Sequence, residues 1–363
     1  MFKIKLNIEP RLLPSAGAIL SVSFFALAIA LLAASLIFLT YDIKPVEAYR
    51  LFFKGAFGSW YAISETIKRT IPLLLTGIGL AFSFKASVWN IGAEGQILLG
   101  AIFGSWIALF SGIPAPFLLI AMFAFGFLGG AVWALVAAVL RSKLAVNEII
   151  TSLMLNYVAA NIVLYLIHGP WKGQGARGFA YTDTFPESAW LGTIGSTRIP
   201  YATLIIGIII ALICYLLISR TTLGYEIRVV GNSIRTARLV GINDFKIALL
   251  AMFVSGGLAG LAGVGEVSGI HHLLRHPSHI SLGYGYTAII VAWLARNNPL
   301  AVILTAFFFG ALVSGGDALR VSLGIPFQLV YVLNGLILFS LIASERLTSY
   351  KLSFQRKNEK ERR

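Results

Sequence analysis

Residues 87–100 read SVWNIGAEGQILLG and place three polar side chains, Asn90, Glu94 and Gln96, between long apolar segments. The interior of a bilayer holds no water, so each such group needs a protein partner or a cavity. A carboxylate at the centre of a membrane helix costs roughly 2.5–3.5 kcal/mol on insertion scales. The stretch therefore indicates a membrane protein that handles a polar solute.

The composition of the whole chain agrees with a membrane location. Of its 363 residues, 58% are hydrophobic and 12% are charged, whereas soluble domains carry about 25% charged residues. A helix needs about 20 apolar residues to cross a bilayer. We expect an all-α, polytopic integral membrane protein with about ten transmembrane helices, at 16–39, 70–84, 88–110, 115–140, 146–168, 200–219, 247–267, 283–296, 299–316 and 325–344.

The segment at 283–296 is the best candidate for a broken or re-entrant helix, because Gly283, Gly285 and Pro299 bracket it. The first segment is too long for the apolar part of a signal peptide and is interpreted as an uncleaved span. We expect a basic cytoplasmic N-terminus at 1–15, a single transmembrane domain at 16–345 and a basic cytoplasmic tail at 346–363.

The distribution of charge predicts the orientation. With the N-terminus inside the cell, most of the 29 Lys and Arg fall in cytoplasmic segments, as the positive-inside rule requires. Both termini are then cytoplasmic. The net charge of +14 reflects this topology and contact with anionic lipid, and it does not indicate nucleic acid. Cys214 is the one cysteine, which excludes intrachain disulfides and cysteine-based metal sites.

The cytoplasmic segment Arg220–Lys246 is longer than the other inner connections and contains several arginines. We expect a short helix at 233–240 with Asn232 or Ser233 as its N-cap. The segment is either a solvated positive loop or a docking element for a cytoplasmic partner. The small residues of the following span, FVSGGLAGLAGVG at 253–265, favour close helix packing and the second interpretation. The pairs Gly100–Gly104 and Gly126–Gly130 are further packing faces.

Three motifs resemble the permease subunits of ATP-binding-cassette (ABC) importers. They are WNIGAEGQILLGA at 89–101, TTLGYEIRVVGNSIRTARLVGIN at 221–243 followed by SGGLAGLAG at 255–263, and GYGYTAIIVAWLARNNP at 283–299. More narrowly, the chain is similar to the branch that shares its architecture with ribose and branched-chain amino-acid permeases and is typified by nucleoside permeases. The resemblance covers roughly residues 15–345.

This resemblance implies a cell-membrane protein that is not an enzyme and holds no cofactor. Two permeases, identical or related, would form the pore with a cytoplasmic ATPase pair and an extracytoplasmic solute-binding protein. No Gly in the chain precedes a Lys, so the P-loop is absent and ATP would bind a separate subunit. The family implies that segment 220–246 couples to that ATPase through Gly224, Tyr225, Arg228, Gly231, Arg235, Arg238 and Gly241.

The family also implies an inverted repeat, with spans two to five mirrored by spans seven to ten. The candidate solute path comprises Asn90, Glu94, Gln96, Asn156, Asn161, Glu266 and Asn334. Each has a structural alternative: Glu94 could cap a neighbouring half-helix, and the asparagines could bridge helices. Asn90 and Glu94 lie four residues apart on one helical face, and Gln96 is turned away from them. Asn147 and Glu148 are expected to start a helix.

The solute remains open at this level. A nucleoside is the leading interpretation, with a sugar or a branched-chain amino acid as alternatives within the family. A proton-coupled secondary transporter would use Glu94, Glu148 or Glu266 as its proton carrier, and these carboxylates are expected to lack a basic residue at similar depth. His271, His272, His276 and His279 do not suggest a metal site, because no cysteine or nearby acid completes the set. The outer segment 169–200 is either a receptor-docking surface or a lid.

Overall fold

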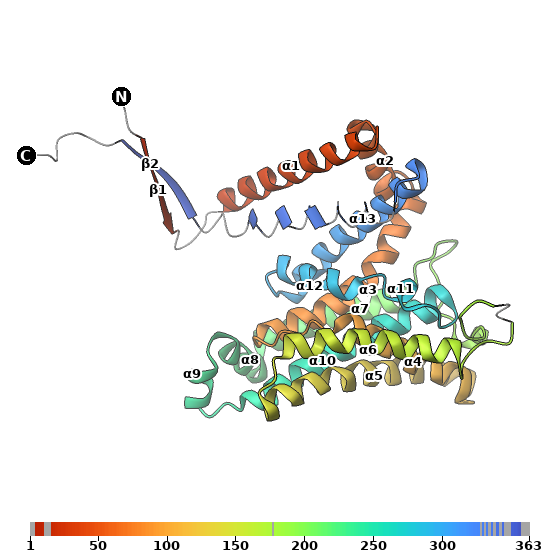
Figure 1. Cartoon of the computed structure of the whole chain (residues 1–363). Coiled ribbons are helices and arrows are strands. Elements are labelled where there is room, and N and C mark those ends of the chain that lie inside the picture. The colour runs from red at the N-terminus through yellow and green to blue at the C-terminus, as the bar shows by residue number, and fades with distance from the viewer. Residues whose placement is uncertain are drawn as a thin grey trace, which may run out of the picture. The chain divides into compact units, whose positions relative to one another are not determined.

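The computed structural model describes residues 4–10, 16–175, 178–326 and 350–356, together with isolated residues 329, 332, 335–336, 339–340 and 343–344. These residues are nearly all helical (Figure 1), so the predicted fold class is confirmed. The helices are α1 (Ala16–Thr40), α2 (Pro45–Phe57), α3 (Trp60–Lys85), α4 (Ala93–Phe110), α5 (Ala115–Leu144), α6 (Glu148–His168), α7 (Tyr201–Arg220), α8 (Thr222–Asn232), α9 (Ile234–Leu239), α10 (Asp244–Glu266), α11 (Pro277–Ile280), α12 (Tyr284–Leu294) and α13 (Pro299–Leu323).

The described part of the chain also contains four shorter elements. A 3₁₀ turn lies at Glu187–Ala189, and a π-helical turn at Val267–His271 continues α10. Strands β1 (Ile4–Pro10) and β2 (Tyr350–Arg356) pair antiparallel, with Ile4 opposite Arg356. This pairing of the two terminal segments is not predicted by the sequence patterns.

Seven helices within the described ranges are long and apolar enough to cross a membrane: α3, α4, α5, α6, α7, α10 with its π turn, and α13. The pair α1 and α2 is bent by 113° and adds an eighth if it forms one broken span. Helix α12 has only 11 residues, which rise about 16 Å against a hydrocarbon core of about 30 Å. The expected short or broken helix is therefore present. Most of the predicted tenth segment, 325–344, lies outside the described residues, so the inverted repeat stays a prediction.

The predicted start of the second span is wrong by ten residues. The sequence places the second span at 70–84, whereas α3 begins at Trp60. The helix starts there because Ser59 caps it by accepting the N–H of Ala62 at 3.1 Å. It then tolerates the charges of Glu65 and Lys68, because these side chains pair across one turn.

The chain divides into two compact units. The first comprises Met1–Gly55 and Gly315–Arg363. Its described core packs α1 against α2, with the rings of Phe38 and Tyr49 5.8 Å apart in an edge-to-face contact. The second unit, Ala56–Ser314, contains most of the helices and every functional candidate treated below except Asn334, which lies outside the described residues.

Helix α10 forms the centre of the second unit and packs against α3, α4 and α5 (Figure 1). Glycines make this packing close: a Cβ on Gly260 would lie 2.1 Å from the carbonyl oxygen of Gly126, and one on Gly256 would lie 2.4 Å from that of Gly130. A Cβ on Gly100 would similarly meet Gly260 at 2.2 Å. The prediction that these glycines form packing faces is confirmed, and the faces lie within the chain.

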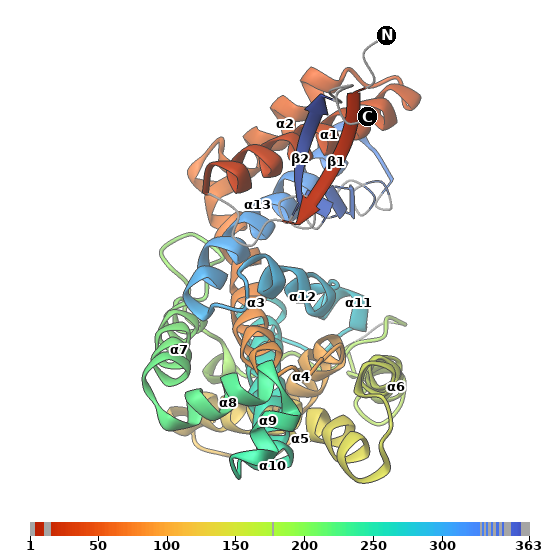
Figure 2. The ribbon, with the colours of Figure 1, turned by 90° about the vertical axis from the view of Figure 1, so that its left-hand side faces the viewer.

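Helices α6 and α7 lie on opposite sides of this bundle (Figure 2). In the 18-residue apolar stretch of α3, 89% of the residues are buried. The corresponding shares in α6 and α7 are 22% and 28%. A helix that is apolar but unburied within the protein suits a lipid environment. The central position of α3 and α10 places their polar residues inside the bundle.

Candidate functional site

The amides of Asn90 and Gln96 bind one another in both directions. Asn90 Nδ2 donates to Gln96 Oε1, and Gln96 Nε2 donates to Asn90 Oδ1, each at 2.8 Å. Asn90 also donates to Ser255 Oγ of α10 at 2.9 Å and accepts the N–H of Gly92 at 3.0 Å. Both side chains are buried. The expectation that they face apart is wrong, because α4 begins only at Ala93 and Asn90 precedes its first turn.

Glu94 joins α4 to the beginning of α12. Its two carboxylate oxygens accept the backbone N–H groups of Gly283, at 3.0 Å, and Gly285, at 2.7 Å. These donors lie at a helix N-terminus, where N–H groups lack partners within the helix and favour negative charge. Gly283 has φ +74°, and a Cβ on Gly285 would lie 2.2 Å from the backbone nitrogen of Glu94. The structure thus shows the capping contact, one of the two roles that the sequence leaves open for Glu94.

Asn156 ties α6 to the same region. Its Oδ1 accepts the N–H of Gly95 at 2.8 Å, and its Nδ2 donates to the carbonyl oxygen of Ile91 at 2.9 Å and to Tyr286 Oη at 3.3 Å. This is the helix-bridging alternative. Asn161 is exposed and donates only within its own helix, to Tyr157. Asn334 lies outside the described residues.

The other end of α6 corrects one expectation. Asn147 caps the helix by accepting the N–H of Ile149 at 2.9 Å, as predicted. Glu148, however, does have a basic partner, because Arg141 Nη1 lies 2.9 Å from its carboxylate. The pairing arises because α5 continues to Leu144, beyond the predicted end of the span at 140. The prediction of a carboxylate without a basic residue at similar depth is therefore wrong at Glu148. It is also wrong at Glu266, which lies within electrostatic range of Lys68, Arg69 and Arg198.

Segment 220–246 folds into two short helices. The predicted helix is α9, and Ser233 caps it by accepting the N–H of Thr236 at 3.2 Å. Helix α8 is not predicted by the sequence patterns, because Gly224 and Gly231 lower the helix propensity of that stretch. Thr221 supplies its cap by accepting the N–H of Gly224 at 3.1 Å. A threonine placed like Thr221 before this stretch is a common helix N-cap, and it could have indicated the start of α8.

The three glycines of this segment have distinct structural roles. A Cβ on Gly224 would lie 2.2 Å from the carbonyl oxygen of Leu217, and a Cβ on Gly231 would lie 2.0 Å from that of Lys85. Gly231 also accepts from Ser87 Oγ at 2.7 Å, which joins α8 to the end of α3. Gly241 adopts φ +79°, where only glycine is unstrained. The segment is therefore closely packed against its own spans.

Two arginines of α8 and α9 bind groups of the same chain. Arg228 donates to the carbonyl oxygen of Ile218 at the end of α7, and the exposed Arg238 forms a two-pronged pair with Asp244 at 2.9 and 3.0 Å. Tyr225 and Leu239 are exposed by 57% and 83%. Exposed apolar side chains on a surface element are typical of docking sites. Arg235 of α9 and Val240, the residue that follows α9, are exposed as well.

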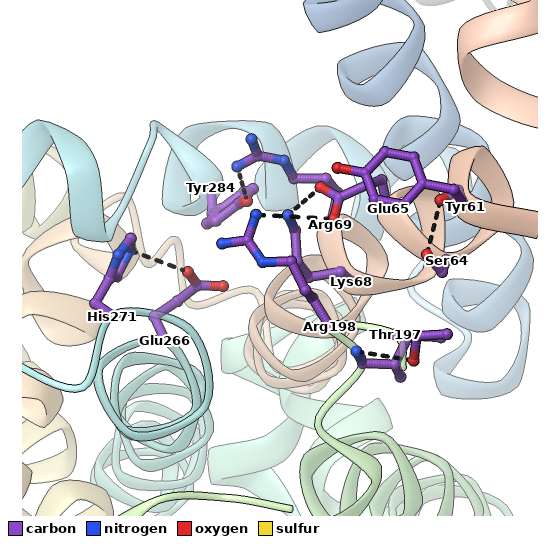
Figure 3. Close-up of polar contacts among 11 residues, drawn as sticks. Tyr61, Ser64, Glu65, Lys68, Arg69, Thr197, Arg198, Glu266, His271 and Tyr284 are labelled. Carbon is purple, nitrogen blue, oxygen red and sulfur yellow. Dashed lines mark hydrogen bonds and ion pairs between the residues drawn. The ribbon is translucent and has the colours of Figure 1, made fainter. Parts of the chain in front are cut away.

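A charged cluster between α3 and α10 was not predicted. Its members come from α3 (Glu65, Lys68, Arg69), from the segment before α7 (Arg198), from the end of α10 (Glu266) and from the π turn that follows it (His271), as Figure 3 shows. Lys68 pairs with Glu65, and Arg69 Nη1 donates to Tyr284 Oη of α12 at 2.9 Å. The predicted second span, 70–84, leaves these α3 residues outside the membrane helix. Their i, i+3, i+4 spacing among apolar residues was the signal for a helix with one charged face.

The comparisons with known proteins place this architecture in a family. Residues 62–342 match the family described as the permease component of the branched-chain amino acid transport system. The chain belongs to this family. It is therefore the permease component of an ABC transporter, a multi-pass protein of the cell membrane that works with an ATPase and is not itself an enzyme.

Three relatives of the permease illustrate the solutes found among similar chains. The glucose ABC transporter permease protein TsgB13 of Haloferax volcanii is 33% identical over 96% of this chain and 94% of its own length. The nucleoside ABC transporter permease protein NupB of Lactococcus lactis is 31% identical over 88% of this chain and 89% of its own. The guanosine ABC transporter permease protein NupP of Bacillus subtilis is 28% identical over 90% and 93%.

Proposed function

We propose that the permease imports a nucleoside. The observation that supports this solute is its similarity to two permeases named for nucleoside and guanosine transport, over about nine-tenths of the chain in each case. The solute would cross near Asn90, Glu94, Gln96, Asn156, Asn161, Glu266 and Asn334. Because the amides of Asn90, Gln96 and Asn156 are bound by the protein in this structure, they would support the path in this state rather than contact solute.

A simple sugar is the second candidate solute. It is favoured by the glucose permease relative, which is 33% identical and matches almost the full chain. Nucleosides and hexoses share a hydroxylated ring, so a polar path through an apolar bundle suits both. A branched-chain amino acid carries opposite charges that would need paired counter-charges, and among the named relatives no observation favours it.

Energy coupling would pass through α8 and α9. The exposed side chains of Tyr225, Arg235 and Leu239 would contact the ATPase, while Arg228 and Arg238 hold the element against its own chain. The ATP would bind that partner, because the chain carries no P-loop. This assignment requires α8 and α9 to face the cytoplasm, as they do if both termini are inside.

The complete assembly would contain a second permease, identical or related, and an extracytoplasmic solute-binding protein. The test is purification of the tagged chain from native membranes in mild detergent, with mass spectrometry of the proteins that accompany it. Recovery of an ATPase, a binding protein and a second permease is expected. The binding protein is then titrated with guanosine and with glucose. Binding of guanosine supports the nucleoside, binding of glucose alone supports the sugar, and binding of neither overturns both.

A further inference from the structure

The charged cluster of Glu65, Lys68, Arg69, Arg198, Glu266 and His271 contains polar atoms without partners. The Glu266 side chain is only 7% exposed, and among the described residues its one close polar neighbour is His271 Nε2, at 3.7 Å. That distance is too long for a hydrogen bond. His271 Nε2 and Glu65 Oε1 are themselves buried with no hydrogen-bond partner in the described part of the chain.

Unpaired polar atoms in a buried place are costly. Each one forfeits about 1–3 kcal/mol of hydration without recovering it, and such groups in a folded protein call for an explanation. Here His271 Nε2, on the π turn, lies beside the Glu266 carboxylate at the end of α10, and Glu65 Oε1 lies on α3 (Figure 3). A ligand that donates to Glu266 and accepts from His271 or a neighbouring cation would satisfy the Glu266–His271 pair.

The charges of the cluster define what kind of ligand fits. Glu266 is a strong acceptor, and Lys68, Arg69 and Arg198 lie within electrostatic range of it. The Glu266 carboxylate would repel an anionic ligand, and the three positive side chains would repel a cationic ligand. A hydroxyl group both donates and accepts. A neutral ligand with adjacent hydroxyls therefore matches the set.

We propose that this cluster is a solute-binding subsite in which the Glu266 carboxylate accepts hydrogen bonds from two adjacent hydroxyl groups of the ring. The ribose of a nucleoside and the ring of glucose both carry such a pair, so the subsite serves either solute. The inference rests on the proposed function. It places the contact between the solute hydroxyls and Glu266 at the end of the bundle where α3 begins and α10 ends. In the proposed orientation, that end faces the binding protein.

The test uses the complete transporter, with its ATPase and binding protein, in proteoliposomes. Uptake of guanosine is compared with uptake of 2′,3′-dideoxyguanosine, which lacks both hydroxyls, and glucose is compared with 2-deoxyglucose. The Glu266→Gln variant is expected to lower the preference for the hydroxylated solute about tenfold, the loss typical of a charge-assisted hydrogen bond. The same binding protein is present throughout, so a changed preference reports the permease.

Glu148→Gln is the matched control, because Glu148 pairs with Arg141 outside the cluster. It should leave the preference unchanged. An equal loss of uptake for both members of a solute pair in Glu266→Gln would assign Glu266 a structural role and overturn the subsite, as would unchanged uptake. If Glu266→Gln does not assemble, Glu266→Asp keeps the charge and provides the same comparison. Failure of the unmodified transporter to take up either solute class would instead overturn the proposed function.

Discussion

The carboxylate of Glu94 lies 2.7 Å from the backbone nitrogen of Gly285, although the two residues are far apart in the sequence. With the second bond to Gly283 at 3.0 Å, this contact places the start of the short helix α12 directly against α4. A helix too short to span the membrane needs partners for its first N–H groups. Glu94 supplies two of them.

Glu94→Ala should therefore destabilise the permease by about 1.5–3 kcal/mol, the range for hydrogen bonds to a charged group. Glu94→Gln should cost less, because its amide oxygen can still accept one bond. The measurement is the fraction of monodisperse protein that remains after heating in detergent, followed by size-exclusion chromatography. Glu187→Ala, in an exposed turn, is the control. An Ala variant as heat-resistant as the unmodified chain would contradict the capping role.

The pair Asn90–Gln96 predicts a non-additive effect. Asn90→Ala leaves the buried Gln96 amide without its main partner and should cost about 1–3 kcal/mol. Replacing Gln96 by Leu in the same chain removes the unpaired group. The double variant should then be less destabilised than the sum of the two single variants. The same heating assay measures all three proteins, and strict additivity would show that the two amides do not act as a unit.

The glycine contact between α5 and α10 predicts a strong steric effect. Gly260→Ala would place a Cβ 2.1 Å from the carbonyl oxygen of Gly126, so the helices must separate. Overpacking of this kind typically costs about 1–3 kcal/mol. Gly175→Ala is the control, because nothing lies within 4 Å of its Cβ position. Equal yields of folded protein from both variants would be inconsistent with close α5–α10 packing.

The outward face of α9 predicts a separation of assembly from folding. Leu239 is 83% exposed, so Leu239→Asp should leave the fold intact but prevent the ATPase from docking. The expected result is normal membrane expression with at least about tenfold less co-purified ATPase, because a central apolar contact commonly contributes more than 1 kcal/mol. Phe179→Asp, also exposed but between α6 and α7, should retain the ATPase. Full recovery with Leu239→Asp would remove α9 from the interface.

The contact between His272 and Trp190 predicts a local pH dependence. Their rings stack with centroids 4.2 Å apart, and burial lowers the pKa of the His272 side chain below its usual value of 6.5. The neutral form is thus favoured in the folded protein, so this contribution to stability is complete above pH ~6.5 and is lost as the pH falls below it. Heat resistance at pH 5 and pH 7.5 should differ less in His272→Asn, which also tolerates the φ of +56°.

The membrane class, the approximate spans, the short helix α12 and the existence of helix α9, with its cap narrowed to Asn232 or Ser233, all followed from the sequence. These features depend on local quantities: the length of apolar segments, the positions of Gly and Pro, and the spacing of a capping side chain. The family motifs are local too. A single chain is therefore sufficient to recognise them.

The partners of the polar residues depended on the tertiary structure. Only folding brought Ser255 to Asn90, Gly285 to Glu94 and His271 toward Glu266. In a membrane interior each polar side chain must take whichever partner the packed helices bring within reach. That choice depends on the separation and rotation of helices distant in sequence, which apolar periodicity does not encode. The sequence by itself determined that Asn90, Glu94 and Gln96 enter the bundle, and the packing of helices distant in sequence decided what each of them contacts.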